Sequence, residues 1–160
     1  MPSSIKPKLT DLWRDKCGVS AIEFAIIGSL LATLMLGAYD LGNAAQQEIQ
    51  LQTAVRSGGA FAINWPTNVA GIQNAVASAL PTGWVLTNPG GVAVVACSCM
   101  NASSGVVTSL SGCTTADFET CAAGSGLLIS VMATMAYTSV DTLFAAAIPQ
   151  LSATYVTRFQ

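Results

Sequence analysis

Few side chains in this sequence are suited to acid–base or nucleophilic chemistry. Its 160 residues contain no histidine, the commonest general base and metal ligand, so a Ser-His-Asp or Cys-His site within the chain is excluded. A cofactor-free hydrolase could still use the carboxylates of Asp117, Glu119 and Asp141. Asp117 and Glu119 lie in a cysteine-bounded loop, where solvated surface charges are the expected reading. We therefore predict no enzyme, no cofactor and no metal.

The cysteines form a second candidate group. Cys17 stands apart, and four others follow much later in the chain: Cys97, Cys99, Cys113 and Cys121. Outside the cytoplasm, four cysteines indicate two disulfides. On a regular strand Cys97 and Cys99 point the same way, so we expect each to pair with Cys113 or Cys121, and both connectivities stay open. A four-cysteine zinc site is the alternative, although its usual Cys-x-x-Cys pairs are missing.

The third candidate is Glu23, the single charge in the apolar segment Val19–Tyr39. As a helix, these 21 residues span about 31 Å, the thickness of the hydrocarbon core of a bilayer. Four cations precede the segment, so we expect the N-terminus in the cytoplasm and the residues after Tyr39 outside it. Those cations are Lys6, Lys8, Arg14 and Lys16. A cleavable signal peptide is the alternative, but the apolar core is long for one and contains a glutamate.

A carboxylate inside a membrane is expected to need a cation, because burying it costs about 2.5–3.5 kcal/mol on insertion scales. A cut after Gly18 would create an amine at Val19, one helical turn from Glu23. In a polymer, Glu23 of one subunit could instead neutralise the amine of its neighbour. Gly28 and Gly37 would let such helices approach closely.

The elements beyond the membrane are read from periodicity. The helix is expected to continue to Asn64, with Ala45, Ile49, Gln52, Val55 and Gly59 on one face, and to end at Trp65-Pro66. A second helix is predicted over Asn68–Leu80, with Thr67 as its N-cap. Three strands are predicted, over Val92–Cys99, Leu127–Ser139 and Leu151–Phe159.

These elements define an α+β fold. A long N-terminal membrane-spanning helix continues outside the membrane, followed by a short second helix and a small antiparallel sheet of about three or four strands. Only 9% of the residues are charged, and none between Ser57 and Ala116. Such a neutral domain fits either a surface that packs in an assembly or a small secreted domain with a polar coat. Nucleic acid is not expected as a partner, because four of the six Lys and Arg residues precede Gly18 and leave no basic strip.

Several motifs carry a resemblance to a known family. Gly18–Phe24, after a basic leader, resembles the processing site of type IV prepilins. Ala54–Ala60 is similar to the Ala-Ala-Arg-x-Gly-Ala run of the TadE/TadG-like pseudopilins, and Leu151–Arg158 resembles their terminal strand. The Cys-x-Cys at Cys97 also recurs in that family. Tyr39–Gly42 departs from the family's aromatic-glycine pattern, and we regard it as compatible.

The resemblance implies a pilin-like domain organisation. A prepilin peptidase would cut between Gly18 and Val19 and remove residues 1–18, Cys17 included. Residues 19–39 would be the transmembrane helix, and residues 40–160 a periplasmic or extracellular helix-plus-sheet domain. Glu23 would serve assembly and charge pairing.

The function implied is that of a minor pseudopilin in assembly of a tight-adherence (Tad/Flp) type IV pilus, for adhesion or biofilm formation. Its partners would be prepilin peptidase, other pilins and pseudopilins, and the inner-membrane pilus platform, in a hetero- or homo-oligomer. Its location would be the bacterial inner membrane or an extracellular pilus. The alternative is a non-polymerising, membrane-anchored periplasmic binding domain that keeps residues 1–18.

Overall fold

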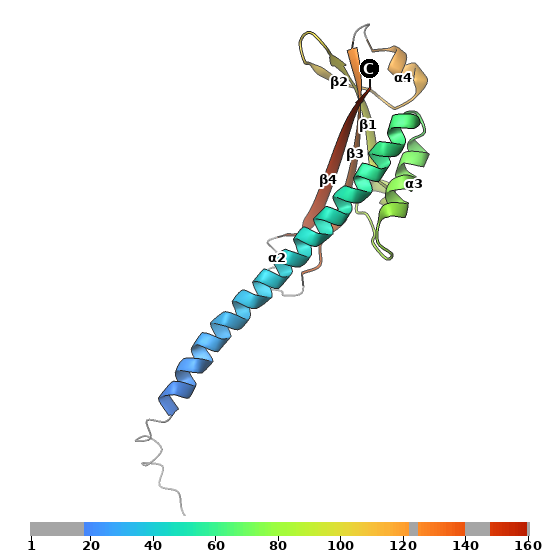
Figure 1. The fold of residues 1–160 in the computed structure, drawn as a ribbon. Coiled ribbons are helices and arrows are strands. Elements are labelled where there is room, and N and C mark those ends of the chain that lie inside the picture. Colours follow the sequence, from blue (N-terminus) through green and yellow to red (C-terminus); the bar gives the residue numbers. More distant parts are fainter. Residues whose placement is uncertain (1–17, 122–124, 140–147, 160) are drawn as a thin grey trace, which may run out of the picture. The chain divides into compact units, whose positions relative to one another are not determined.

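The computed structural model describes residues 18–121, 125–139 and 148–159 (Figure 1). The chain divides into two units, residues 1–39 and 40–160. In chain order the elements are α2 (Val19–Asn64), α3 (Val69–Ala79), the 3-10 turn η2 (Pro89–Gly91), β1 (Val94–Asn101), β2 (Val107–Ser109), α4 (Thr115–Glu119), β3 (Ser125–Ala136) and β4 (Gln150–Phe159). The expected α+β class, with a long apolar helix, a short second helix and a small antiparallel sheet, is confirmed.

The two main helices end where proline and polar caps dictate. Helix α2 stops at Asn64, directly before Trp65-Pro66, because the residue before a proline disfavours the helical region. Helix α3 begins at Val69, and its N-cap is Asn68 rather than the expected Thr67. The Asn68 side chain accepts a hydrogen bond from the Gly71 amide at 2.9 Å. Both residue types cap helices well, so local preference did not separate them.

The buried face of α2 differs from the expected one. Leu51, Ala54, Val55 and Ala62 are fully buried, whereas Ile49 is 63% exposed. Ala45 and Gln52 of the expected face are also exposed. The prediction was correct for Val55 and Gly59, which are buried, and wrong for the other three residues. Alanine and glycine occur on several sides of this helix, so hydrophobicity alone does not mark the buried side. Small residues are buried here because they let neighbouring elements approach closely.

The sheet is antiparallel, with strand order β2-β1-β3-β4. Strand β3 alternates as expected, with Ile129, Val131, Ala133 and Met135 buried. Strand β4 follows the same period, and its register against β3 runs without interruption from Gln150 to Phe159. The short strand β2 and the helix α4 lie between β1 and β3, where the sequence analysis predicted no element.

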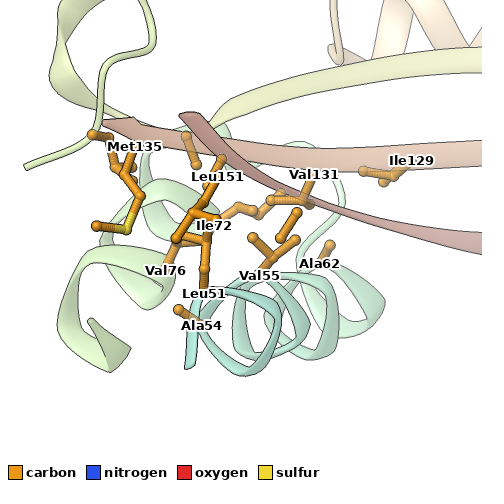
Figure 2. Packing of buried hydrophobic residues seen from close by; sticks show 14 of the residues in the cluster. Leu51, Ala54, Val55, Ala62, Ile72, Val76, Ile129, Val131, Met135 and Leu151 are labelled. Atoms are coloured by element: carbon orange, nitrogen blue, oxygen red, sulfur yellow. The ribbon is translucent and has the colours of Figure 1, made fainter. Parts of the chain in front are cut away.

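We call the second unit, residues 40–160, the outer unit. Its core lies between the helices and one face of the sheet. Figure 2 shows residues of α2 and α3 facing side chains from β3 and β4. Its largest fully buried side chains include Leu51, Ile72, Ile129 and Val131. The opposite face of the sheet carries partly exposed residues such as Val94, Met132 and Val156, and no described element covers it.

Candidate functional site

The candidate processing site lies at the start of α2. Gly18 precedes the first residue of the helix, Val19, whose side chain is 63% exposed. A methyl group added at Gly18 would meet nothing within 4 Å. Residues 1–17, which contain the basic leader and Cys17, lie outside the described residues. Both residues of the expected cut are therefore uncovered by the described part of the chain.

Glu23 lies on an exposed apolar surface near this helix start. Its neighbours along the helix include Val19, Ile22, Phe24 and Ile27, all large, apolar and exposed. Among the described residues, no hydrogen-bond or ion-pair partner reaches the Glu23 carboxylate. Such a group beside uncovered apolar side chains must meet its cation outside the described part of this chain, or remain solvated.

The first part of α2 is long and apolar enough to cross a membrane, and its most apolar window is not buried by the protein. Its exposed side chains include Leu30, Leu31, Leu34 and Met35. Water does not solvate such a surface favourably, at a cost of about 25 cal/mol for each Å² of apolar area. The exposed apolar helix supports a single-pass membrane anchor.

The Ala54–Ala60 motif is where α2 packs on the rest of the outer unit. The Ser57 hydroxyl lies 2.9 Å from the Ala75 carbonyl of α3 and 2.7 Å from the Ala54 carbonyl of its own helix. A Cβ atom at Gly58 would lie 2.5 Å from the Val76 side chain of α3. The motif therefore allows α3 to pack closely on α2.

The next glycine of the motif allows the sheet to pack closely on α2. A Cβ atom at Gly59 would lie 2.1 Å from the Tyr155 ring of β4. Gly58 and Gly59 are thus needed for close packing rather than for chemistry. Arg56, in the same motif, is exposed, and no described residue pairs with its guanidinium. Arg56 remains available for a partner.

A buried carboxylate missed by sequence reasoning joins α2 to the end of the strand region. Asp40 is only 4% exposed. The Tyr137 hydroxyl lies 2.7 Å from Asp40 Oδ1 and 2.9 Å from its carbonyl oxygen, and the Ser139 hydroxyl donates to Oδ2. Burying a carboxylate requires such donors. The only sequence signal was the aspartate after Tyr39, where an aromatic-glycine pair was expected.

The four outer cysteines form two disulfides. Cys97 bonds to Cys113 and Cys99 bonds to Cys121, with Cα–Cα distances of 5.4 and 5.6 Å. This is one of the two connectivities that the sequence left open. Both bonds tie strand β1 to the segment that contains α4. With these cysteines in disulfides, no thiolate among them remains for a zinc site.

Asp117 caps a helix rather than facing a cleft. Its carboxylate accepts from the Thr114 hydroxyl at 2.5 Å and from the Thr114 amide at 3.0 Å, while the Thr114 hydroxyl accepts from the Asp117 amide. This reciprocal capping box starts α4. These hydrogen bonds from Thr114, with one from the Ser111 hydroxyl, lower the pKa of Asp117. A carboxyl group with a lowered pKa is unsuited to act as a general acid. Glu119 is exposed, and Asp141 lies outside the described residues.

Open hollows occur on the described surface of the outer unit, among them two with defined linings. One, of about 450 Å³, lies beside the Cys99–Cys121 disulfide and is lined by uncharged side chains such as Asn101 and Thr108. The other, of about 520 Å³, is lined by Gln52, Arg56, Thr154 and Tyr155. Among the described lining residues of the two hollows, Arg56 of the second is the one charged side chain.

These features define a class: α+β proteins with an N-terminal apolar helix able to cross a membrane and a four-stranded sheet stapled by disulfides. Within this class the chain carries a TadE-like segment. The family model described as TadE-like protein matches residues 18–59, which confirms the resemblance over those residues. The likeness of residues 151–158 lies outside the match and stays a prediction. No match was found among curated proteins or among solved structures.

Proposed function

We propose that this chain is a minor pseudopilin that takes part in assembling a tight-adherence (Tad/Flp) type IV pilus, for adhesion or biofilm formation. The observation that carries the proposal is the TadE-like match over residues 18–59. The matched residues begin at Gly18, contain Glu23 and continue through the apolar part of α2. They end at Gly59, inside the motif that packs on α3 and β4. The match thus includes both the expected processing site and the part of α2 on which α3 and β4 pack.

Processing and charge pairing are the steps we assign to the first matched residues. Prepilin peptidase cuts between Gly18 and Val19 on the cytoplasmic side and leaves α2 in the bilayer. The new amine of Val19 pairs with Glu23, in the same chain or in a neighbouring subunit. Pairing lowers the cost of holding both charges in a medium of low dielectric constant. Absence of a described partner for Glu23 fits this role.

Assembly then proceeds by packing of apolar helices. Residues 19–39 remain in the inner membrane until α2 packs against other pilins or the membrane platform. Gly28 supports this step, because a Cβ atom there would meet no described atom within 4 Å, and a glycine lets a second helix approach closely. Residues 40–160 lie in the periplasm or on the extracellular pilus, where disulfides form. The alternative function is a membrane-anchored periplasmic binding domain that does not polymerise and is not cut.

The test is the N-terminus of the mature protein. Intact mass and N-terminal sequencing are measured on chain extracted from membranes, with and without the host's prepilin peptidase. A start at Val19 that depends on the peptidase is the expected result. A start at Met1 in both hosts contradicts the proposal and favours the uncut binding domain. A start near Ala45 shows instead that the apolar segment is a signal peptide.

A further inference from the structure

One edge of the long strand β4 has no partner strand among the described residues. Strand β4 ends the order β2-β1-β3-β4, and Figure 1 shows it at one side of the sheet. It spans Gln150–Phe159, contains no proline and pairs with β3 without a bulge. Natural proteins usually blunt such edges with short strands, prolines or bulges, because an open edge can pair with another chain.

The register shows which backbone groups of β4 point outward. The Thr134 amide of β3 donates to Asn88 Oδ1, and its carbonyl accepts from the Thr87 amide, on the side of β3 away from β4. Ser152 lies directly opposite Thr134, so its amide and carbonyl point away from β3. Since these directions alternate along a strand, the same holds for Thr154, Val156 and Arg158. No described segment pairs with these outward groups.

A cationic side chain, that of Arg56, lies beside this open edge of β4. Arg56 and Gln52 of α2, with Thr154 and Tyr155 of β4, line the open hollow of about 520 Å³. Arg56 and Gln52 are exposed, and none of the described residues that line the hollow carries a carboxylate. Glu48, on the same helix, lies two turns away, about 12 Å along the axis. A strand added to β4 would place the residue opposite Tyr155 on the helix side of the sheet, next to Arg56.

We propose that the free edge of β4 binds an extended acidic segment of another protein as an added strand, with a carboxylate of that segment pairing with Arg56. The backbone groups of Thr154 and Val156 supply the hydrogen bonds, and Arg56 selects the charge. A second copy of β4 fits poorly, because this strand contains no carboxylate. Such a pair, centred near Tyr155, would bring two copies of Arg56 together, and like charges repel. This inference does not depend on the role in pilus assembly.

The test measures peptide binding to the full chain in detergent micelles. The probe is a fluorescent, end-capped peptide of about nine residues, the length of the strand, with alternating Thr and Val and one central Glu. Its twin carries Gln at that position. Fluorescence anisotropy is expected to show binding of the Glu peptide about five-fold tighter than its twin at low salt. Added salt should shrink this difference.

Two variants separate the charge from the edge. Arg56→Gln is expected to abolish the preference for Glu, while the control Glu48→Gln, on the same helix, keeps it. Thr154→Pro removes an outward amide without removing a bond to β3, and should weaken both peptides. Amide exchange of Thr154 and Val156 in the unaltered chain, with and without the Glu peptide, provides a reading that needs no variant. We expect both amides to become protected on binding.

Three results overturn the proposal. One is the absence of binding by either peptide, and another is equal affinity for the Glu and Gln peptides. The third is a dimer of the chain that forms without peptide and is lost in Thr154→Pro, since a second copy would then occupy the edge. Processing at Val19 is measured independently, so failure here leaves the proposed function untouched.

Discussion

At the scale of single residues, one glycine of α2 is needed for close packing, whereas another contacts no described residue. The helix contains Gly59 against the Tyr155 ring and Gly42 in open space. The same substitution at these two positions therefore tests the role of close approach directly, because intrinsic helix preference changes equally in both.

Gly59→Ala is expected to destabilise the outer unit. The added Cβ atom forces the Tyr155 ring to move, and overpacking of about 1–3 kcal/mol outweighs the gain in helix preference of up to about 1 kcal/mol. Gly42→Ala is the matched control and should leave stability unchanged or raise it slightly. Urea unfolding of the full chain in detergent, followed by tyrosine and tryptophan fluorescence, measures both. Equal midpoints for the two variants would falsify the packing role.

Asp117 gives the outer unit a response to acid. Its hydrogen bonds to Thr114 and Ser111 lower its pKa in the folded chain. The stability that this carboxylate contributes is therefore fully present above the ordinary aspartate pKa of about 3.9. It is lost as pH falls through the lower folded value, because the protonated group no longer accepts these bonds equally.

We expect amide exchange in α4 to accelerate in that acidic range, after correction for the intrinsic pH dependence of exchange. Asp117→Asn should show weak protection of α4 even at neutral pH and little further change in acid. Glu119→Gln, a nearby exposed carboxylate, should behave like the unaltered chain. If Glu119→Gln removes the acid response instead, the assignment to the capping box is wrong.

At the scale of elements, the two disulfides hold β1 to the segment around α4. The bonded cysteines are 16 and 22 positions apart in the sequence. In the chain-entropy model, a disulfide that closes a loop of this size stabilises the folded protein by about 3 kcal/mol. Cys97 and Cys113 are almost fully buried, whereas Cys99 and Cys121 are only partly so.

Removal of the Cys97–Cys113 pair, as a double alanine variant, should therefore cost more than removal of the Cys99–Cys121 pair. We expect about 2–4 kcal/mol for either bond, with an added cavity cost at the buried pair. Urea unfolding of both double variants measures the difference, and peptide mapping without reduction establishes the connectivity. Peptides that join Cys97 to Cys121 contradict the observed pairing, and a larger loss at the Cys99 pair contradicts the role of burial.

At the scale of the whole molecule, the proposed function requires insertion and assembly to respond oppositely to Glu23. A carboxylate hinders insertion of an apolar helix, yet the proposed charge pair needs it. Glu23→Ala is therefore expected to insert into the membrane at least as well as the unaltered chain, but to abolish its part in pilus assembly.

Carbonate-resistant membrane retention and the count of surface pili measure the two effects. Glu48→Ala, in the same helix but outside the apolar segment, is the control and should support normal piliation. Normal piliation by Glu23→Ala refutes the charge-pairing mechanism. Loss of membrane retention by that variant shows that the defect arises before assembly.

Sequence alone determined the two main helices and three of the four strands, but not β2 or α4. A proline after Trp65 predicted the end of α2, and period-two alternation predicted the buried face of β3, because both signals act within a few residues. The same reading recognised the TadE-like segment, since its apolar run and its glycine-to-glutamate spacing are contiguous in the chain.

Tertiary structure alone decided which distant groups meet. Asp40 and Tyr137 are 97 positions apart, and nothing local in either sequence neighbourhood predicts their hydrogen bond. The choice between two cysteine connectivities, the burial of Ala54 in place of Ile49 and the open edge of β4 are of the same kind. Each depends on how closely two surfaces can approach, and that distance is set by the packing of the complete outer unit.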